Sequence, residues 1–184
     1  SNCIGGIAGI TSGGVVSNCK NSGSLTSLGG QDCGGIVGRA KGTVKLSSNT
    51  GGVAAYRNHS GGIVGASNGV AVEECFNSGR VSAASGAGNS SAGIVGGLDS
   101  ASVTTTITKC YNSGAAQIGI IAADSNVTVT ECYNAGAISH NHITAASTAK
   151  ISNSYFYWAS GATVDGATCF TSLEQFKDAD NMRE

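Results

Sequence analysis

A short apolar phrase recurs along the chain, and a polar segment rich in turn-forming residues follows each copy. The phrase reads GGIAG from Gly5, GGIVG from Gly34 and again from Gly61, and AGIVG from Ala92. A more divergent copy, IGIIA, begins at Ile118. The hydrophobic pattern is therefore that of an internal repeat, and the repeat has to be defined before any motif is interpreted.

A second phrase, of the form polar-Cys-aromatic-Asn-small-Gly, follows the apolar one. It reads ECFNSG from Glu74, KCYNSG from Lys109 and ECYNAG from Glu131. In six units its central position is held by Cys19, Ser47, Cys75, Cys110, Cys132 and Ser154. A β-branched residue stands three positions earlier in every unit: Val16, Val44, Val72, Ile107, Val129 and Ile151. Because a spacing of three breaks strict alternation, we expect a bulge or corner between these two inward positions.

Each unit can supply only short strands and turns, which is too little to bury its own apolar face, so the units must stack on one another. The expected fold is all-β: a right-handed parallel β-helix (β-solenoid) of about six rungs over residues 1–158. Residues 159–184 are expected to form a cap or linker with a short helix from Thr171 to Met182, where Ser172 and Gln175 resemble a capping box. A cap would cover the open end of the coil, where unpaired strand edges invite association.

In a β-helix, equivalent positions of successive units lie over one another. The asparagines of the second phrase should then form a hydrogen-bonded ladder at a bend, because an amide both donates and accepts. The ladder consists of Asn21, Asn49, Asn77, Asn112 and Asn134. Asn also tolerates a left-handed backbone, and a glycine two residues later is consistent with a turn. The Cys column should pack inside, and Glu74, Lys109 and Glu131 should form an outward column of alternating charge.

An aromatic column follows the Cys position in four units. Its members are Phe76, Tyr111, Tyr133 and Tyr155. Facing outward, these rings would make a stacked platform suited to sugar rings or a protein partner, whereas facing inward they would be part of the core. Core or partly buried packing is the preferred interpretation, and the outward platform remains the alternative.

Composition narrows the function further. The chain has 29 Gly, no Pro, 11% charged residues and a formal net charge of −1. This balance argues against nucleic-acid binding, which needs clustered Lys and Arg. No apolar run approaches the roughly 18 residues of a membrane helix, so no membrane span is expected.

The residues that could carry chemistry are scattered. Seven cysteines include no CxxC pair, so no metal site is expected, and any disulfide should involve the off-column residues Cys3, Cys33 and Cys169. His140 and His142 could chelate a metal from one face of a strand, but a solvated loop is the simpler interpretation. The acidic residues Asp32, Asp99, Asp124 and Asp165 belong to different parts of the chain. We therefore expect no catalytic residues, no metal and no cofactor.

The two phrases together resemble the GLUG motif, with Ile in place of the usual Leu in Gly35-Ile36-Val37-Gly38 and its equivalents. The resemblance covers about residues 4–158. It implies a noncatalytic region of a bacterial cell-surface or secreted protein, such as an adhesin or an IgA-protease-like protein. The expected role is an adhesive or structural spacer module that contacts a host glycan or protein, or neighbouring domains. The alternative is a carbohydrate-binding or carbohydrate-active β-helix.

Overall fold

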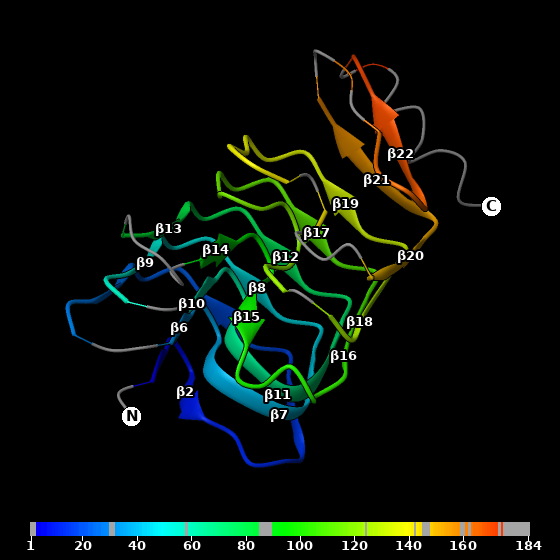
Figure 1. Ribbon diagram of the computed structural model, residues 1–184. Coiled ribbons are helices and arrows are strands. Elements are labelled where there is room, and N and C mark those ends of the chain that lie inside the picture. The colour runs from blue at the N-terminus through cyan, green and yellow to red at the C-terminus, as the bar shows by residue number, and fades with distance from the viewer. Residues whose placement is uncertain are drawn as a thin grey trace.

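The computed structural model of the protein describes residues 3–29, 32–57, 59–84, 90–123, 125–141, 143–144, 148–158, 161, 163–172 and 174. In this part of the chain the regular elements are short β-strands, and the paired strands run parallel to one another. The predicted all-β class with parallel sheets is confirmed. Figure 1 shows the strands following one another from blue at the N-terminus to orange near the C-terminus.

Within the described residues the strands form four sheets. Sheet A contains β1 (Ile4–Gly5), β6 (Cys33–Gly34), β10 (His59–Gly61) and β14 (Ser90–Ala92). Sheet B contains β2 (Ala8–Ile10), β3 (Val15–Ser17), β7 (Val37–Lys45), β11 (Val64–Glu73), β15 (Val95–Leu98), β16 (Thr105–Thr108), β18 (Val127–Thr130) and β20 (Lys150–Ser152).

The other two sheets carry the second phrase and the segment that follows it. Sheet C contains β4 (Lys20–Asn21), β8 (Ser48–Asn49), β12 (Phe76–Asn77), β17 (Tyr111–Asn112), β19 (Tyr133–Asn134), β21 (Ser154–Tyr157) and β22 (Ala167–Phe170). Sheet D contains β5 (Leu25–Ser27), β9 (Val53–Ala55) and β13 (Val81–Ala83).

Strand register places each repeat directly against the next. In sheet B, Val44 pairs with Val72 and Val72 with Ile107, and in sheet C, Asn77 pairs with both Asn49 and Asn112. These partners are the equivalent positions of consecutive units. The arrangement is consistent with the predicted β-helix.

The core is built from the same columns. The first apolar residue of the recurring phrase is fully buried at Ile36, Ile63, Ile94 and Ile120. The β-branched residue before the Cys position is equally buried at Val72, Ile107 and Val129. Both columns belong to one continuous apolar cluster, which explains why a single unit could not fold alone.

Sheet D stops partway along the molecule. Between Gly79 and Gly93 the chain forms β13 and β14, whereas between Gly114 and Gly119 it spans only four intervening residues and makes isolated bridges. One of these bridges joins Ala116 to Ile138 in the following repeat. In the described part of the later repeats, isolated bridges therefore take the place of a sheet D strand.

At the C-terminal end, β22 pairs with β21 and so continues sheet C past residue 158. The expected helix from Thr171 to Met182 lies mostly outside the described residues. Among the described residues there is no helix long and apolar enough to pass through a bilayer.

Candidate ligand-binding face

The second phrase alternates between the inside and the outside of sheet C. In β12 the Asn77 side chain is fully buried, while the preceding Phe76 is only partly buried. Cys75, one residue earlier, is buried again. Because neighbouring side chains of a strand point to opposite faces, the phrase supplies an inward Cys, an outward ring and an inward Asn.

The inward asparagines are joined in a continuous ladder. Each Nδ2 donates to Oδ1 of the next asparagine, at 2.8 Å from Asn21 to Asn49, 2.9 Å from Asn49 to Asn77, 2.9 Å from Asn77 to Asn112 and 2.8 Å from Asn112 to Asn134. The second Nδ2 proton of Asn77 goes to the carbonyl oxygen of Gly79, and the same bond occurs in the other repeats up to Asn112. At Asn134 the buried Nδ2 has no partner in the described part of the chain, because the next residue in register is Phe156.

The asparagine column packs against the glycine pair of the apolar phrase within the same repeat. A Cβ added to Gly62 would overlap the amide group of Asn77, and one added to Gly35 would overlap Asn49. Gly6 and Gly93 stand in the same relation to Asn21 and Asn112. The two phrases therefore recur together, because the asparagine of the second phrase packs against the glycine pair of the apolar phrase.

The sharp bend of each repeat lies elsewhere than expected. The asparagines sit in strands, whereas the left-handed backbone falls on the residue before each Cys position. These residues are Asn18, Leu46, Glu74, Lys109, Glu131 and Asn153, with φ between 46° and 56°. The expected corner between the two inward positions is confirmed, but the assignment of left-handed geometry to the asparagines is wrong.

Glycine is required after each asparagine for a different reason from the predicted turn. None of Gly51, Gly79 and Gly114 has a positive φ. Instead, a Cβ on Gly79 would overlap the carbonyl of Gly51 in the preceding repeat. Close approach of stacked backbones requires glycine here, rather than a turn conformation.

The Cys column is a buried structural column. The thiols of Cys75, Cys110 and Cys132 each point at the carbonyl oxygen two residues earlier, and the hydroxyls of Ser47 and Ser154 donate to the equivalent carbonyls. This shared bond explains why Ser can replace Cys in two repeats. All seven cysteines are free. Burial raises the pKa of Cys33 to about 11 and that of Cys110 well above its usual value, so both thiols stay protonated at neutral pH.

The outward rings form a stacked column on sheet C. The Phe76 and Tyr111 rings stack with centroids 5.3 Å apart and planes 8° apart, and Tyr133 stacks on Tyr155 at 5.2 Å. Tyr155 also stacks on Phe170 of β22 at 5.8 Å. Tyr133 is only 6% exposed, whereas Phe76, Tyr111 and Tyr155 are partly exposed. We call this set (Phe76, Tyr111, Tyr133, Tyr155) the aromatic column.

A column of charges runs beside the rings. Glu74, Lys109 and Glu131 precede the Cys positions of their repeats, and Lys109 Nζ lies 3.9 Å from Glu131 Oε2. Both side chains of this pair are about half exposed, at 55% and 44%. Such an exposed pair contributes at most about 1 kcal/mol of stability and leaves the charges available to a partner.

The structure also brings together a polar cluster that the sequence did not indicate. Asp32, which is 1% exposed, accepts hydrogen bonds from Arg39 Nε at 3.0 Å and Arg39 Nη2 at 2.6 Å. His59 Nδ1 lies 3.0 Å from the other carboxylate oxygen, and Asp99 binds the remaining Arg39 nitrogen at 3.2 Å. The view of Asp32 and Asp99 as isolated carboxylates is therefore wrong, because Arg39 joins them. We call Asp32, Arg39, His59 and Asp99 the Asp32 cluster.

The Asp32 cluster links side chains from different repeats. Its members come from β7, β10 and the segments preceding β6 and following β15. Cys3 adds a weak thiol contact to Asp32 at 3.7 Å, but burial and the neighbouring Asp32 raise the pKa of that thiol, which disfavours a nucleophilic thiolate. The described residues contain no group of three or more His, Cys, Asp or Glu able to hold a metal ion.

The described residues do not show a metal site at His140 and His142 either. His140 is exposed, and its Nδ1 lies 2.9 Å from the hydroxyl of Ser139. His142 and Asp124 lie outside the described residues. The structure therefore locates only one histidine of the pair, which lies on a segment between isolated bridges of the fifth repeat.

Stability should depend on pH through Asp32. Burial alone would raise the pKa of Asp32, but hydrogen bonds from His59 and Arg39 outweigh it and hold that pKa below its usual 3.8. A carboxyl whose pKa is lower in the folded state stabilises the fold above the unfolded-state pKa and loses that contribution as the pH falls through the folded value. Asp32→Asn should therefore be less stable than the wild type at pH 7, and the difference should shrink below about pH 4.

Denaturant unfolding at pH 7 and pH 3 measures this difference. Asp165→Asn is the matched control, because Asp165 is exposed and is not part of the Asp32 cluster. A difference between Asp32→Asn and the wild type that is as large at pH 3 as at pH 7 would show that the carboxylate charge contributes nothing.

Comparisons with known proteins identify no relative for this arrangement: no family model, no curated protein and no solved structure matches the chain.

Proposed function

We propose that this chain is a noncatalytic repeat module of a bacterial cell-surface or secreted protein, folded as a right-handed β-helix of six rungs. The in-register parallel pairing of equivalent positions supports the coil. The hand follows from the strong preference of parallel crossover connections for right-handed geometry. The GLUG-like phrases support the surface location through the resemblance alone.

The observation that carries the binding role is the aromatic column. Its rings repeat with the strands, which hydrogen bonding holds about 4.8 Å apart. The stacked ring centroids lie 5.2–5.3 Å apart, and three of the four rings are partly exposed. Stacked ring faces and edges offer a large, rigid contact area at little cost in side-chain entropy. The exposed Lys109–Glu131 pair beside them adds polar contacts. A host glycan or protein is the proposed partner.

A catalytic role finds less support. A polysaccharide-cleaving site needs two carboxyl groups arranged as acid and base, or as metal ligands. Asp32 and Asp99, which approach one another in the structure, both bind Arg39. Both carboxyl groups are engaged by that one guanidinium rather than arranged as a free acid and base pair.

Two substitutions in the aromatic column should separate its structural and binding roles. Tyr133→Ala removes a ring that is 6% exposed, so it should lower the free energy of unfolding by about 3 kcal/mol. Tyr111→Ala removes a partly exposed ring and should cost less, about 1–2 kcal/mol, because less apolar area is lost. If the column is an attachment surface, the folded Tyr111→Ala protein should bind a mucin-coated surface more weakly than the wild type.

The control is Thr128→Ala, which changes a partly buried outward position on sheet B instead of sheet C. Denaturant unfolding gives the stability and surface plasmon resonance gives the binding. Wild-type attachment by folded Tyr111→Ala would exclude the aromatic column as the attachment surface and leave the spacer role.

A further inference from the structure

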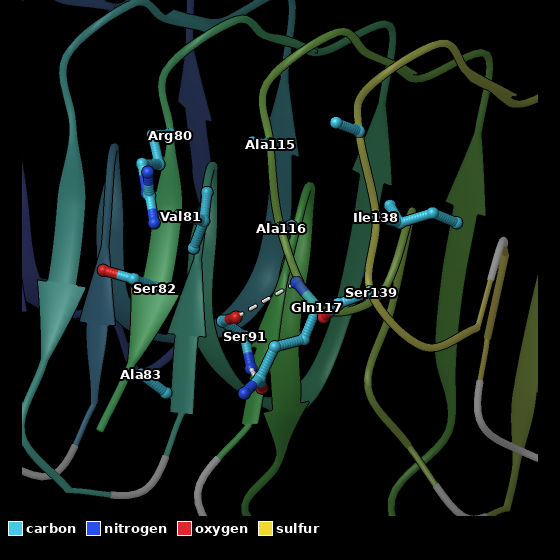
Figure 2. A pocket seen from close by; sticks show the side chains of 11 residues that line it. Arg80, Val81, Ser82, Ala83, Ser91, Ala115, Ala116, Gln117, Ile138 and Ser139 are labelled. Atoms are coloured by element: carbon cyan, nitrogen blue, oxygen red, sulfur yellow. Dashed lines mark hydrogen bonds between the residues drawn. The ribbon is translucent and has the colours of Figure 1, made fainter. Parts of the chain in front are cut away.

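The end of sheet D produces a groove on a different face from the aromatic column. Two adjoining hollows share Ser82 and Ala83 of β13. The larger, of about 380 Å³, lies between β13 and the narrower repeats that follow, and Figure 2 shows β13 on one side and Ala115, Ala116 and Ile138 on the other. The smaller, of about 240 Å³, continues over the ends of β5 and β9.

The groove runs across the strands and therefore along the direction in which the repeats stack. Its floor consists of small side chains, such as Ala54, Ser82 and Ala116, which leave room above the backbone. The strands beneath it are already paired with one another, Leu25 with Val53 and Val53 with Val81. An extended peptide lying along the groove would cross these strands instead of running beside the edge of β13, so it could not add a strand to sheet D.

The rim carries apolar and polar groups at separate places. Tyr56 is 60% exposed and Leu28 is 81% exposed, both beside the smaller hollow. Arg80, also exposed, stands at the head of β13 above the larger hollow (Figure 2). Gln117 crosses toward Ser91, where its Oε1 accepts from the Ser91 N–H at 3.0 Å. An exposed ring and amide or hydroxyl groups are the usual elements of a sugar site.

The charges of the groove point to an anionic ligand. Arg80 lines the larger hollow and the exposed Arg57 follows Tyr56, whereas the described lining residues include no Asp or Glu. A guanidinium recognises a carboxylate through paired hydrogen bonds.

We infer that the groove over sheet D binds a linear acidic polysaccharide, with Tyr56 stacking on a sugar ring and Arg80 binding a carboxylate of the chain. The inference deepens the adhesive role proposed above and rests on it, but it uses other residues. Sugar units that follow one another along the groove would lie over successive strands about 4.8 Å apart.

Polygalacturonate oligosaccharides are a suitable probe, with a neutral galactan of the same length as the comparison. Isothermal titration calorimetry should detect binding of the acidic chain and little or none of the neutral one. Arg80→Ala and Tyr56→Ala should each weaken binding by about tenfold. Both side chains are exposed, so both variants are expected to fold as the wild type does.

Two controls make the outcome specific. Lys41→Ala removes an exposed cation from β7 of sheet B and should leave binding unchanged. Tyr111→Ala alters the aromatic column and should also bind polygalacturonate as the wild type does. The inference is overturned if the wild type does not bind polygalacturonate, if Lys41→Ala weakens binding as much as Arg80→Ala, or if a poly-Glu peptide binds the groove equally well. Mucin binding through the aromatic column would survive each of these results, so the two proposals fail separately.

Discussion

Gly62→Ala should lower the free energy of unfolding by about 3 kcal/mol or more, because the added methyl has no space on either side. The new Cβ would overlap the Gly93 carbonyl of the next repeat and the buried amide of Asn77. Neither neighbour can withdraw cheaply, since one is backbone and the other is held by hydrogen bonds to the repeats on both sides. The substitution therefore tests the packing of the glycine pair against the asparagine ladder.

Gly52→Ala is the matched control for that experiment. A Cβ on Gly52 would meet only Ser24 Oγ at 3.7 Å and Arg80 O at 3.9 Å, which are ordinary contacts. Its unfolding free energy should stay within about 0.5 kcal/mol of the wild type or rise slightly. Equal losses for Gly52→Ala and Gly62→Ala would mean that general backbone effects, and not the contact with Asn77, explain the result.

Asn77→Ala should cost about 3 kcal/mol, since it breaks the ladder at its fully buried centre. The substitution removes the bonds to Asn112 Oδ1 and Gly79 O, both at 2.9 Å, and leaves Asn49 Nδ2 without one of its acceptors. Asn21→Ala should cost about 1 kcal/mol, because Asn21 lies at the half-buried end of the ladder and water can replace its bonds.

Denaturant unfolding of the two variants checks this difference. The slope of the unfolding free energy against denaturant should be the same in both, so that the comparison reports stability. A cost at Asn77 no larger than that at Asn21 would contradict the view that burial gives the ladder its strength.

The columns could be predicted from the sequence because repetition reveals them. Alignment of the Cys phrases predicts inward positions for Val72 and Asn77, and the parallel strand pairs follow that alignment. The left-handed corners could not be located in this way. Leu46, Glu74 and Lys109 occupy the same corner, and none of these residue types signals a positive φ. Stacking against the neighbouring repeats decides the conformation there.

The Asp32 cluster and the groove escaped prediction for different reasons. His59 and Asp99 are far from Asp32 in sequence and belong to no repeated phrase, so only the stacked fold brings them to Arg39. The groove does have a signal in the sequence, which is the length of one segment of the repeat. The segment between the glycine of the second phrase and the next apolar phrase is long after Gly79 but contains only Ala115–Gln117 after Gly114. Too few residues remain for another strand of sheet D.

The direction of the asparagine bonds has a consequence for how such a chain can change in evolution. Each of the three middle asparagines donates a proton to the following repeat and accepts one from the preceding repeat, so the ladder has the same sense throughout. A duplicated whole repeat inserted between Asn77 and Asn112 would find an acceptor ahead of it and a donor behind it. The gene can thus lengthen by copying complete units without breaking the asparagine ladder, up to the position where Phe156 replaces the asparagine and ends the series.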